Sequence, residues 1–226
     1  MSTTPLSRAC ESGGLETVKF LLELGANPLQ DLRTEKYDWP CLIDIICMSE
    51  HPDTLQILEL LLPYGISDPE HTTINPLFMT TGSGRPDMAE AIYKYQNTDD
   101  VVHRALINVV SSAGDPNFDA IDFLIKRIQK IEIIEKVCFE KGKERPGSAL
   151  TVAIYRRKTE AFSRILKKID FLSYDHLWAI RKEIKNLVCN PVIHEEFEKI
   201  LLEEGVLDWY KSVVRFEKDG KFVYFF

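Results

Sequence analysis

The residue types that hold metal ions or act as nucleophiles are scattered along this chain. A zinc site needs closely and regularly spaced ligands, and a catalytic thiol needs a histidine beside it. No two histidines are spaced i, i+4, and no two cysteines form a C-x-x-C pair. We therefore predict no metal site and no cofactor. The residues concerned are His51, His71, His103, His176 and His194, with Cys10, Cys41, Cys47, Cys138 and Cys189.

The cysteines also indicate a compartment. They are odd in number and stand among apolar neighbours, a pattern typical of buried free thiols. We expect a reducing environment, cytoplasmic or otherwise intracellular. No apolar run approaches the roughly 20 residues of a membrane helix, and the start of the chain lacks the layout of a secretory signal, so neither export nor membrane insertion is expected.

Other groups with catalytic potential have simpler explanations. Glu195, Glu196 and Glu198 are typical of a solvated helix face. Residues 82–86 (GSGRP) are glycine-rich but lack the Gly-Lys-Ser/Thr end of a phosphate-binding loop, so an inter-helix turn is expected there. Because no nucleophile, base and orienting group can be assembled, we predict that the chain is not an enzyme.

The charge balance disfavours nucleic-acid binding. The chain has 28 Lys and Arg against 35 Asp and Glu, a net charge of −7, so its field repels phosphate backbones. Basic residues nevertheless concentrate between residues 126 and 168, and stacked units would gather them into one positive patch for an acidic or phosphorylated partner segment. The alternative is ordinary helix surface. These residues are Lys126, Arg127, Lys130, Lys141, Lys143, Arg145, Arg156, Arg157, Lys158, Lys167 and Lys168.

The elements that position these groups are expected to be short amphipathic helices in pairs. Within residues 4–28, Pro5 suits a first helical turn and Thr4 its N-cap. Residues 13 and 14 are glycines that turn the chain, and an apolar face recurs through residues 15–22. Gly25 suits the left-handed residue that ends the second helix. A pair this small cannot bury its own apolar faces, so further pairs must follow.

Paired apolar residues near the end of each second helix mark these further units. They recur at intervals of 31 to 41 residues. The Thr4-Pro5-Leu6 opening is repeated by residues 75–77 and 148–150, and residues 40–46 align with residues 103–109. The first helices at residues 40–46 and 103–109 are therefore predicted to be about a turn longer than the others. The apolar pairs are Leu21-Leu22, Leu61-Leu62, Ile92-Tyr93, Leu124-Ile125, Ile165-Leu166 and Leu201-Leu202.

The first unit resembles an ankyrin repeat. It has the T-P-L-x-x-A opening, the central glycine, the V-x-x-L-L core and the G-A-x-P exit of that family, with Ser7 in place of the usual histidine. The resemblance implies a mainly α fold, an ankyrin-like helical-hairpin solenoid of about six degenerate repeats with a concave binding face. For residues 99–207 another helical-hairpin array, such as a HEAT-like one, stays open.

This interpretation divides the chain into a repeat domain and a short ending. The repeat domain is residues 1–207, in units near 1–34, 35–70, 71–98, 99–140, 141–172 and 173–207. In residues 208–226, Asp219 and Gly220 flanked by alternating apolar residues predict a short C-terminal β-hairpin. The hairpin either caps the last repeat or offers an edge to a partner or a second copy.

The resemblance also implies that a partner contacts loop tips and the exposed side of the first helices. Tyr37 and Trp39 are of the type that anchors interfaces, although Trp39 folded over the seam between two units is an equal alternative. Carried over position by position, the predicted partner-binding residues are Thr3, Glu11, Ser12, Tyr37, Asp38, Trp39, Ser49, Glu50, Thr73, Ser83, Tyr155 and Arg156.

We therefore predict a non-enzymatic protein–protein interaction module: an adaptor, inhibitor, assembly factor or effector that binds another protein through loop tips and the concave face. The alternative is a structural or self-associating protein that uses the C-terminal hairpin or the concave face. No nucleic-acid or membrane partner is expected, and a homo-oligomer is not favoured.

Overall fold

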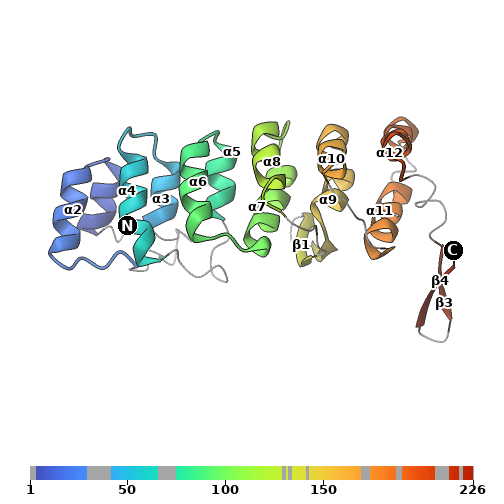
Figure 1. Cartoon of the computed structure of the whole chain (residues 1–226), viewed down its shortest axis with the longest axis horizontal. Coiled ribbons are helices and arrows are strands. Elements are labelled where there is room, and N and C mark those ends of the chain that lie inside the picture. Colours follow the sequence, from blue (N-terminus) through green and yellow to red (C-terminus); the bar gives the residue numbers. More distant parts are fainter. Residues whose placement is uncertain are drawn as a thin grey trace. The chain divides into compact units, whose positions relative to one another are not determined.

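The computed structural model of the chain consists of paired helices and two short hairpins (Figure 1). It describes residues 4–29, 42–65, 75–128, 131, 134–140, 143–168, 174–186, 190–206, 214–218 and 221–225. Contacts divide the chain into two compact units, Met1–Ala105 and Leu106–Phe226. Because α7 (Asp99–Ser111) crosses that division, the boundaries of the individual repeats stay a prediction.

The first unit is built from helices in two rows. The first helices α1, α3 and α5 contact one another in sequence, and so do the second helices α2, α4 and α6. Each first helix also packs against the second helix that follows it. The bounds are α1 (Pro5–Glu11), α2 (Leu15–Glu23), α3 (Leu42–Met48), α4 (Thr54–Leu61), a single 3₁₀ turn η1 (Leu62–Tyr64), α5 (Pro76–Gly82) and α6 (Pro86–Tyr95).

The second unit repeats the same packing. Helix α9 contacts α10 and α11, and α10 contacts α8 and α12. Between α10 and α12, Phe162 and Phe197 meet edge to face, with ring centroids 5.1 Å apart. The bounds are α8 (Phe118–Ile125), β1 (Ile134–Glu140), β2 (Lys143–Gly147), α9 (Ala149–Tyr155), α10 (Thr159–Leu166), α11 (Tyr174–Asn186), α12 (Pro191–Glu203), β3 (Val214–Lys218) and β4 (Lys221–Phe225).

The sequence explains where the first helices begin. Thr4 Oγ1 accepts a hydrogen bond from Ser7 N at 3.0 Å, and Pro5 opens the helix. Asn75 accepts in the same way from Leu77 N at 2.9 Å. At α9, Ser148 and Thr151 cap each other reciprocally. Each cap satisfies a backbone donor that has no partner inside the helix, as predicted from the repeated opening.

The cores of the two units come from the apolar faces of these helices. In unit 1, Val18, Ile57 and Met88 are fully buried, one on each second helix. In unit 2, Leu124, Ile165 and Leu201 are fully buried, again one on each second helix. The predicted apolar pairs thus lie in or directly after the second helices, and at least one member of each pair from Leu61-Leu62 to Leu201-Leu202 is buried.

The structure tests the predictions of a C-terminal hairpin and of lengthened first helices. The C-terminal hairpin is confirmed, since β3 and β4 pair antiparallel from Val214–Phe225 to Lys218–Lys221. The lengthened first helix is confirmed for α7, which has 13 residues against seven in α1. For α3 the residues before Leu42 lie outside the described residues, so its added turn stays a prediction. The β1–β2 hairpin, with register shifts along both strands, was not predicted.

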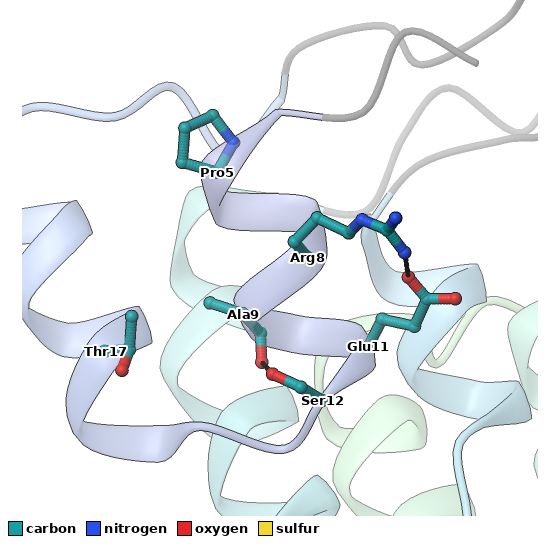
Figure 2. Close-up of a pocket in the computed structure, with 6 residues that line it drawn as sticks. All are labelled: Pro5, Arg8, Ala9, Glu11, Ser12 and Thr17. Atoms are coloured by element: carbon teal, nitrogen blue, oxygen red, sulfur yellow. Dashed lines mark hydrogen bonds and ion pairs between the residues drawn. The ribbon is translucent and has the colours of Figure 1, made fainter.

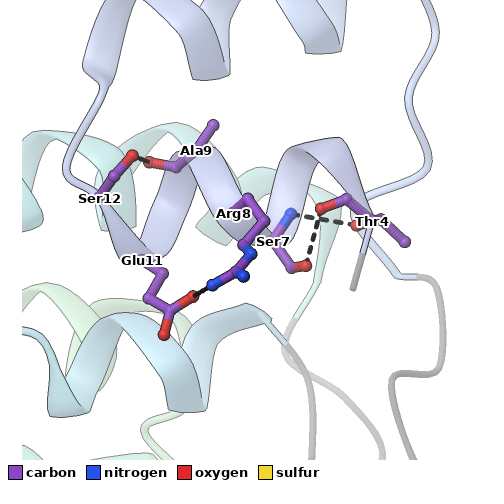
Figure 3. Close-up of polar contacts among 6 residues, drawn as sticks. All are labelled: Thr4, Ser7, Arg8, Ala9, Glu11 and Ser12. Carbon is purple, nitrogen blue, oxygen red and sulfur yellow. Dashed lines mark hydrogen bonds and ion pairs between the residues drawn. The ribbon is translucent and has the colours of Figure 1, made fainter. Parts of the chain in front are cut away.

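Ser7 replaces the family's usual histidine without leaving the turn open. Its backbone N–H donates to Thr4 Oγ1, and its hydroxyl donates to Thr4 O at 2.9 Å. Figure 3 shows these two bonds closing the first turn of α1. The buried serine therefore holds the opening locally.

Gly13 generates a test of the packing. It has φ +69°, and a Cβ there would lie 2.0 Å from Cγ of His51. We expect Gly13→Ala to lower the free energy of unfolding by about 3 kcal/mol, because steric overlap adds to left-handed strain. The control is Gly25→Ala, which has φ +83° and open space around it; its expected cost is about 1 kcal/mol. Equal losses in urea denaturation would show that the His51 contact contributes nothing.

Cys10 generates a second test. Burial raises the pKa of this thiol from 9.0 to about 12. An unfolded thiol ionises near pH 9, whereas Cys10 keeps its proton until about pH 12, so this group's stabilising contribution is lost between those values as pH rises. At pH 8 we expect iodoacetamide to modify Cys10 at least about 100-fold more slowly in the folded chain than in urea. Comparable rates, followed by mass spectrometry of the Cys10 peptide, would contradict its burial.

Candidate functional site

The predicted partner-binding residues fall into two groups. Glu11, Ser12, Ser49, Glu50 and Ser83 lie at helix ends and inter-helix turns of unit 1. Tyr155 and Arg156 lie at the α9–α10 turn of unit 2. The other predicted residues lie outside the described residues, so both interpretations of Trp39 stay predictions. They are Thr3, Tyr37, Asp38, Trp39 and Thr73.

Three inter-helix turns, α1–α2, α5–α6 and α9–α10, share one backbone geometry. A residue in the left-handed region is followed by an N-cap residue with ψ near 75°. The left-handed residues are Gly13 (φ +69°), Gly84 (φ +71°) and Arg157 (φ +60°). The N-cap residues after them, Gly14, Arg85 and Lys158, have ψ values of 74°, 74° and 78°.

Neighbouring turns of unit 1 touch one another. The ring of His51, in the α3–α4 turn, lies against Gly13 of the α1–α2 turn. His51 Nδ1 accepts from Asp53 N at 3.4 Å, which orients the ring. On the other side, Arg85 Nη1 of the α5–α6 turn donates to the Ser49 carbonyl. Three successive turns are thereby joined into one edge, which we term the turn edge.

The α9–α10 turn of unit 2 makes an equivalent contact. Lys158 Nζ donates to Ser112 O at 2.7 Å and to Gly114 O at 2.8 Å, both in the α7–α8 turn. Burial, then the nearby charge of Arg156, lowers the pKa of Lys158, while Asp115 acts in the opposite direction. A cation in the N-cap position of one turn thus binds carbonyls of the preceding turn in both units.

The turn edge brings predicted residues together. Glu11, Ser12, Glu50 and Ser83 are exposed, while Ser49 is half-buried beneath the Arg85 contact. These side chains are small or acidic and project from turns that the contacts hold in place. The arrangement provides hydrogen-bonding groups for another surface.

A shallow hollow lies at one end of this edge, on the outer side of α1 (Figure 2). Its volume is about 480 Å³, and Glu11 and Ser12 are among the residues that line it. Arg8 and Glu11 form an exposed ion pair of 3.0 Å, and Ser12 Oγ donates to Ala9 O at 3.2 Å (Figures 2 and 3). The hollow is open enough for a side chain of a partner. The remaining lining residues are Pro5, Ala9 and Thr17.

The basic residues of unit 2 lie near both ends of α10 in the part of the chain that the structure describes, and the single positive patch that the sequence suggested stays a prediction. Residues 156–158 precede α10 and residues 167–168 follow it, and eight helical residues separate the two groups by about 12 Å. Lys126 and Arg127 follow α8, which packs beside α10. They therefore lie at the same end as residues 167–168. Lys130 and Lys141 lie outside the described residues, and Lys143 and Arg145 lie in β2.

The described part of the chain contains neither a cluster of metal ligands nor a membrane-spanning helix. No group of three or more His, Cys, Asp or Glu side chains there is placed to hold a metal ion. Within the same residues, no helix combines the length and apolar character needed to cross a membrane.

Sequence reasoning missed the contacts that join the turns. Arg85 and Lys158 were treated as a turn residue and as part of a charge run, and His51 as an isolated histidine. One pattern in the sequence was available: Ser49 and Ser112 are 63 residues apart, the same shift that relates the first helices of their units. Both supply the carbonyl that a later cation binds.

Comparisons with known proteins agree with this architecture. The ankyrin-repeat family model matches residues 2–31. Among solved structures, the ankyrin repeat domain of human ASB11 superposes with a TM-score of 0.51 at 16% sequence identity, covering 88% of this chain and 84% of that chain. No curated protein matches the sequence. The structural likeness identifies the fold along most of the chain, including residues for which a HEAT-like array was the alternative.

Lys158 generates a test of the turn contacts. Lys158→Met keeps an unbranched side chain but removes both hydrogen bonds to the α7–α8 turn. We expect the free energy of unfolding to fall by about 1 kcal/mol, because water replaces part of the lost interaction. Lys168→Met, at an exposed position after α10, is the matched control and should stay within about 0.5 kcal/mol of the parent. Indistinguishable urea midpoints for the two variants would show that the Lys158 contact is not stabilising.

Proposed function

We propose that this chain, whose residues 2–31 match the ankyrin-repeat family model and whose fold is that of an ankyrin repeat domain, is a non-enzymatic module that binds another protein through the turn edge of unit 1. Ankyrin repeats generally serve as protein–protein interaction modules. The proposal adds a particular surface: Glu11 and Ser12, Ser49 and Glu50, and Ser83. A module that binds another protein in this way could serve as an adaptor, an inhibitor, an assembly factor or an effector.

The observation that carries the proposal is the contact between successive turns. His51 packs on Gly13, and Arg85 binds the Ser49 carbonyl, so the spacing of the exposed side chains is set before a partner arrives. A surface ordered in advance loses less conformational entropy on binding. Serine also has few rotamers to immobilise, whereas long side chains lose more.

The hollow beside α1 supports a directional contact. It adjoins Glu11 and Ser12 and contains the apolar atoms of Pro5 and Ala9 beside the Arg8–Glu11 pair. Apolar and polar groups side by side are the usual composition of a binding surface. We assign this hollow to a side chain of the partner and the turns to its backbone and polar groups.

The proposal is tested by site-specific photo-crosslinking in the native source. A photoreactive phenylalanine analogue is placed separately at Ser12, Glu50 and Ser83, with exposed Glu59 on α4 as the control position. We expect the same adduct from the three turn positions and none from Glu59. Adducts of two copies of this 26.0 kDa chain alone would instead favour self-association.

Charge reversal provides an independent measurement. Glu11→Lys with Glu50→Lys should abolish recovery of the crosslinked partner, whereas Glu59→Lys should leave it unchanged. All three positions are exposed, so the thermal midpoint should move little. Unchanged recovery by the double variant would contradict binding at the turn edge.

A further inference from the structure

The α9–α10 turn carries an unusual sequence for its geometry. Three consecutive cations, Arg156, Arg157 and Lys158, occupy it. The equivalent residues are Ser12, Gly13 and Gly14 in the α1–α2 turn, and Ser83, Gly84 and Arg85 in the α5–α6 turn. Only the last cation of the three has a counterpart, since Arg85 occupies the position of Lys158.

Arg157 stands where the backbone favours glycine. Its φ is +60°, and it is the only non-glycine with positive φ among the described residues. A side chain with a Cβ is disfavoured in this left-handed conformation. The Arg157 side chain is exposed, so core packing does not explain its presence. A non-glycine residue in this conformation is a starting point for a hypothesis of function.

Among the described residues, neither of the two guanidinium groups of Arg156 and Arg157 has an acceptor. Several other arginines of the described residues have one: Arg8 pairs with Glu11, Arg104 with Asp100, and Arg164 with Asp122 and Glu160. Arg156 and Arg157 are exposed and lack a carboxylate or carbonyl acceptor within the described part of the chain; Arg156 Cζ lies 5.7 Å from the centroid of the Tyr155 ring.

Lys158 supplies the rigidity that this pair needs. Its two hydrogen bonds to Ser112 O and Gly114 O fix the turn against the preceding one. Its ammonium is therefore engaged, while the two guanidinium groups before it face solvent. Asp115 is the acidic group whose charge acts on this turn, through Lys158.

From these observations we infer that Arg156 and Arg157 form a docking point for an acidic segment of a partner protein, one that carries adjacent carboxylates or a phosphoryl group. The inference rests on the proposed function and adds the chemistry of the partner. Adjacent anionic groups suit two neighbouring guanidinium groups, because each guanidinium binds a carboxylate or phosphoryl oxygen pair bidentately. The net charge of −7 makes such a local cationic point selective within an otherwise acidic chain.

The test is fluorescence anisotropy with the full chain and three labelled peptides of one length. One carries six glutamates in a Gly-Ser spacer, one carries phosphoserines in that spacer, and one carries six lysines. The variant is Arg156→Gln with Arg157→Gly. Lys126→Gln with Lys168→Gln is the matched control, which removes the same charge from exposed positions beyond the C-terminal ends of α8 and α10.

We expect an acidic peptide to bind at low salt, the Arg156/Arg157 variant to bind at least about fivefold more weakly, and the control to stay within about twofold. Binding of only the phosphoserine peptide would identify a phosphorylated segment as the source, and binding of the glutamate peptide a carboxylate-rich one. Equal weakening in both variants, binding of the lysine peptide, or no binding of either acidic peptide would overturn the inference.

A stability measurement separates a binding role from a structural one. Arg157→Gly relieves the left-handed strain. Its thermal midpoint should therefore lie between that of the parent and about 3 °C above it, while its binding of the acidic peptide should be weaker. A lowered midpoint would show that Arg157 is structural. The failure of this inference is distinguishable from failure of the proposed function, because crosslinking at Ser12, Glu50 and Ser83 does not depend on Arg156 or Arg157.

Discussion

Contact between one inter-helix turn and the next is the constraint on which the rest of the structure depends. A pair of seven- to nine-residue helices exposes too much apolar surface to fold alone, so each pair relies on its neighbour. His51 against Gly13, Arg85 on the Ser49 carbonyl, and Lys158 on the carbonyls of Ser112 and Gly114 fix how neighbouring pairs meet. The buried faces supply most of the stabilisation, and the turn contacts define the alignment in which those faces meet.

The same turn geometry supports two different surfaces. In unit 1 the left-handed position is glycine, and the exposed neighbours are serines and glutamates. In unit 2 that position is Arg157, and the exposed neighbours are cationic. Where the N-cap residue makes the contact with the preceding turn, as Arg85 and Lys158 do, the residues before it can vary without loss of that contact. Recognition chemistry can therefore differ between units while the packing is kept.

Local features of the sequence predicted much of this fold, and contacts between distant residues were missed. The cap at Thr4 and the left-handed Gly25 follow from neighbouring residues alone, and the apolar pairs follow from helical periodicity. The β1–β2 hairpin has irregular register and no Asn-Gly or Asp-Gly turn to announce it. The reach of Lys158 to a carbonyl 46 residues earlier depends on tertiary placement, which periodicity does not encode. The candidate site shows the same difference. Alignment of the repeats predicted the surface residues Glu11 and Ser83, but it did not predict the contacts that hold their turns in place.

The central claim, that adjacent turns are packed against one another, is tested most directly by a double-mutant cycle on Gly13 and His51. The His51→Ala substitution removes the three atoms that lie nearest to a Cβ at residue 13, so the strain of the left-handed backbone becomes the main cost of Gly13→Ala. The account predicts that Gly13→Ala then costs as little as Gly25→Ala, with a coupling free energy of at least about 1 kcal/mol between the two sites in urea denaturation. Strictly additive costs would contradict the account, because they would show that the two turns do not touch.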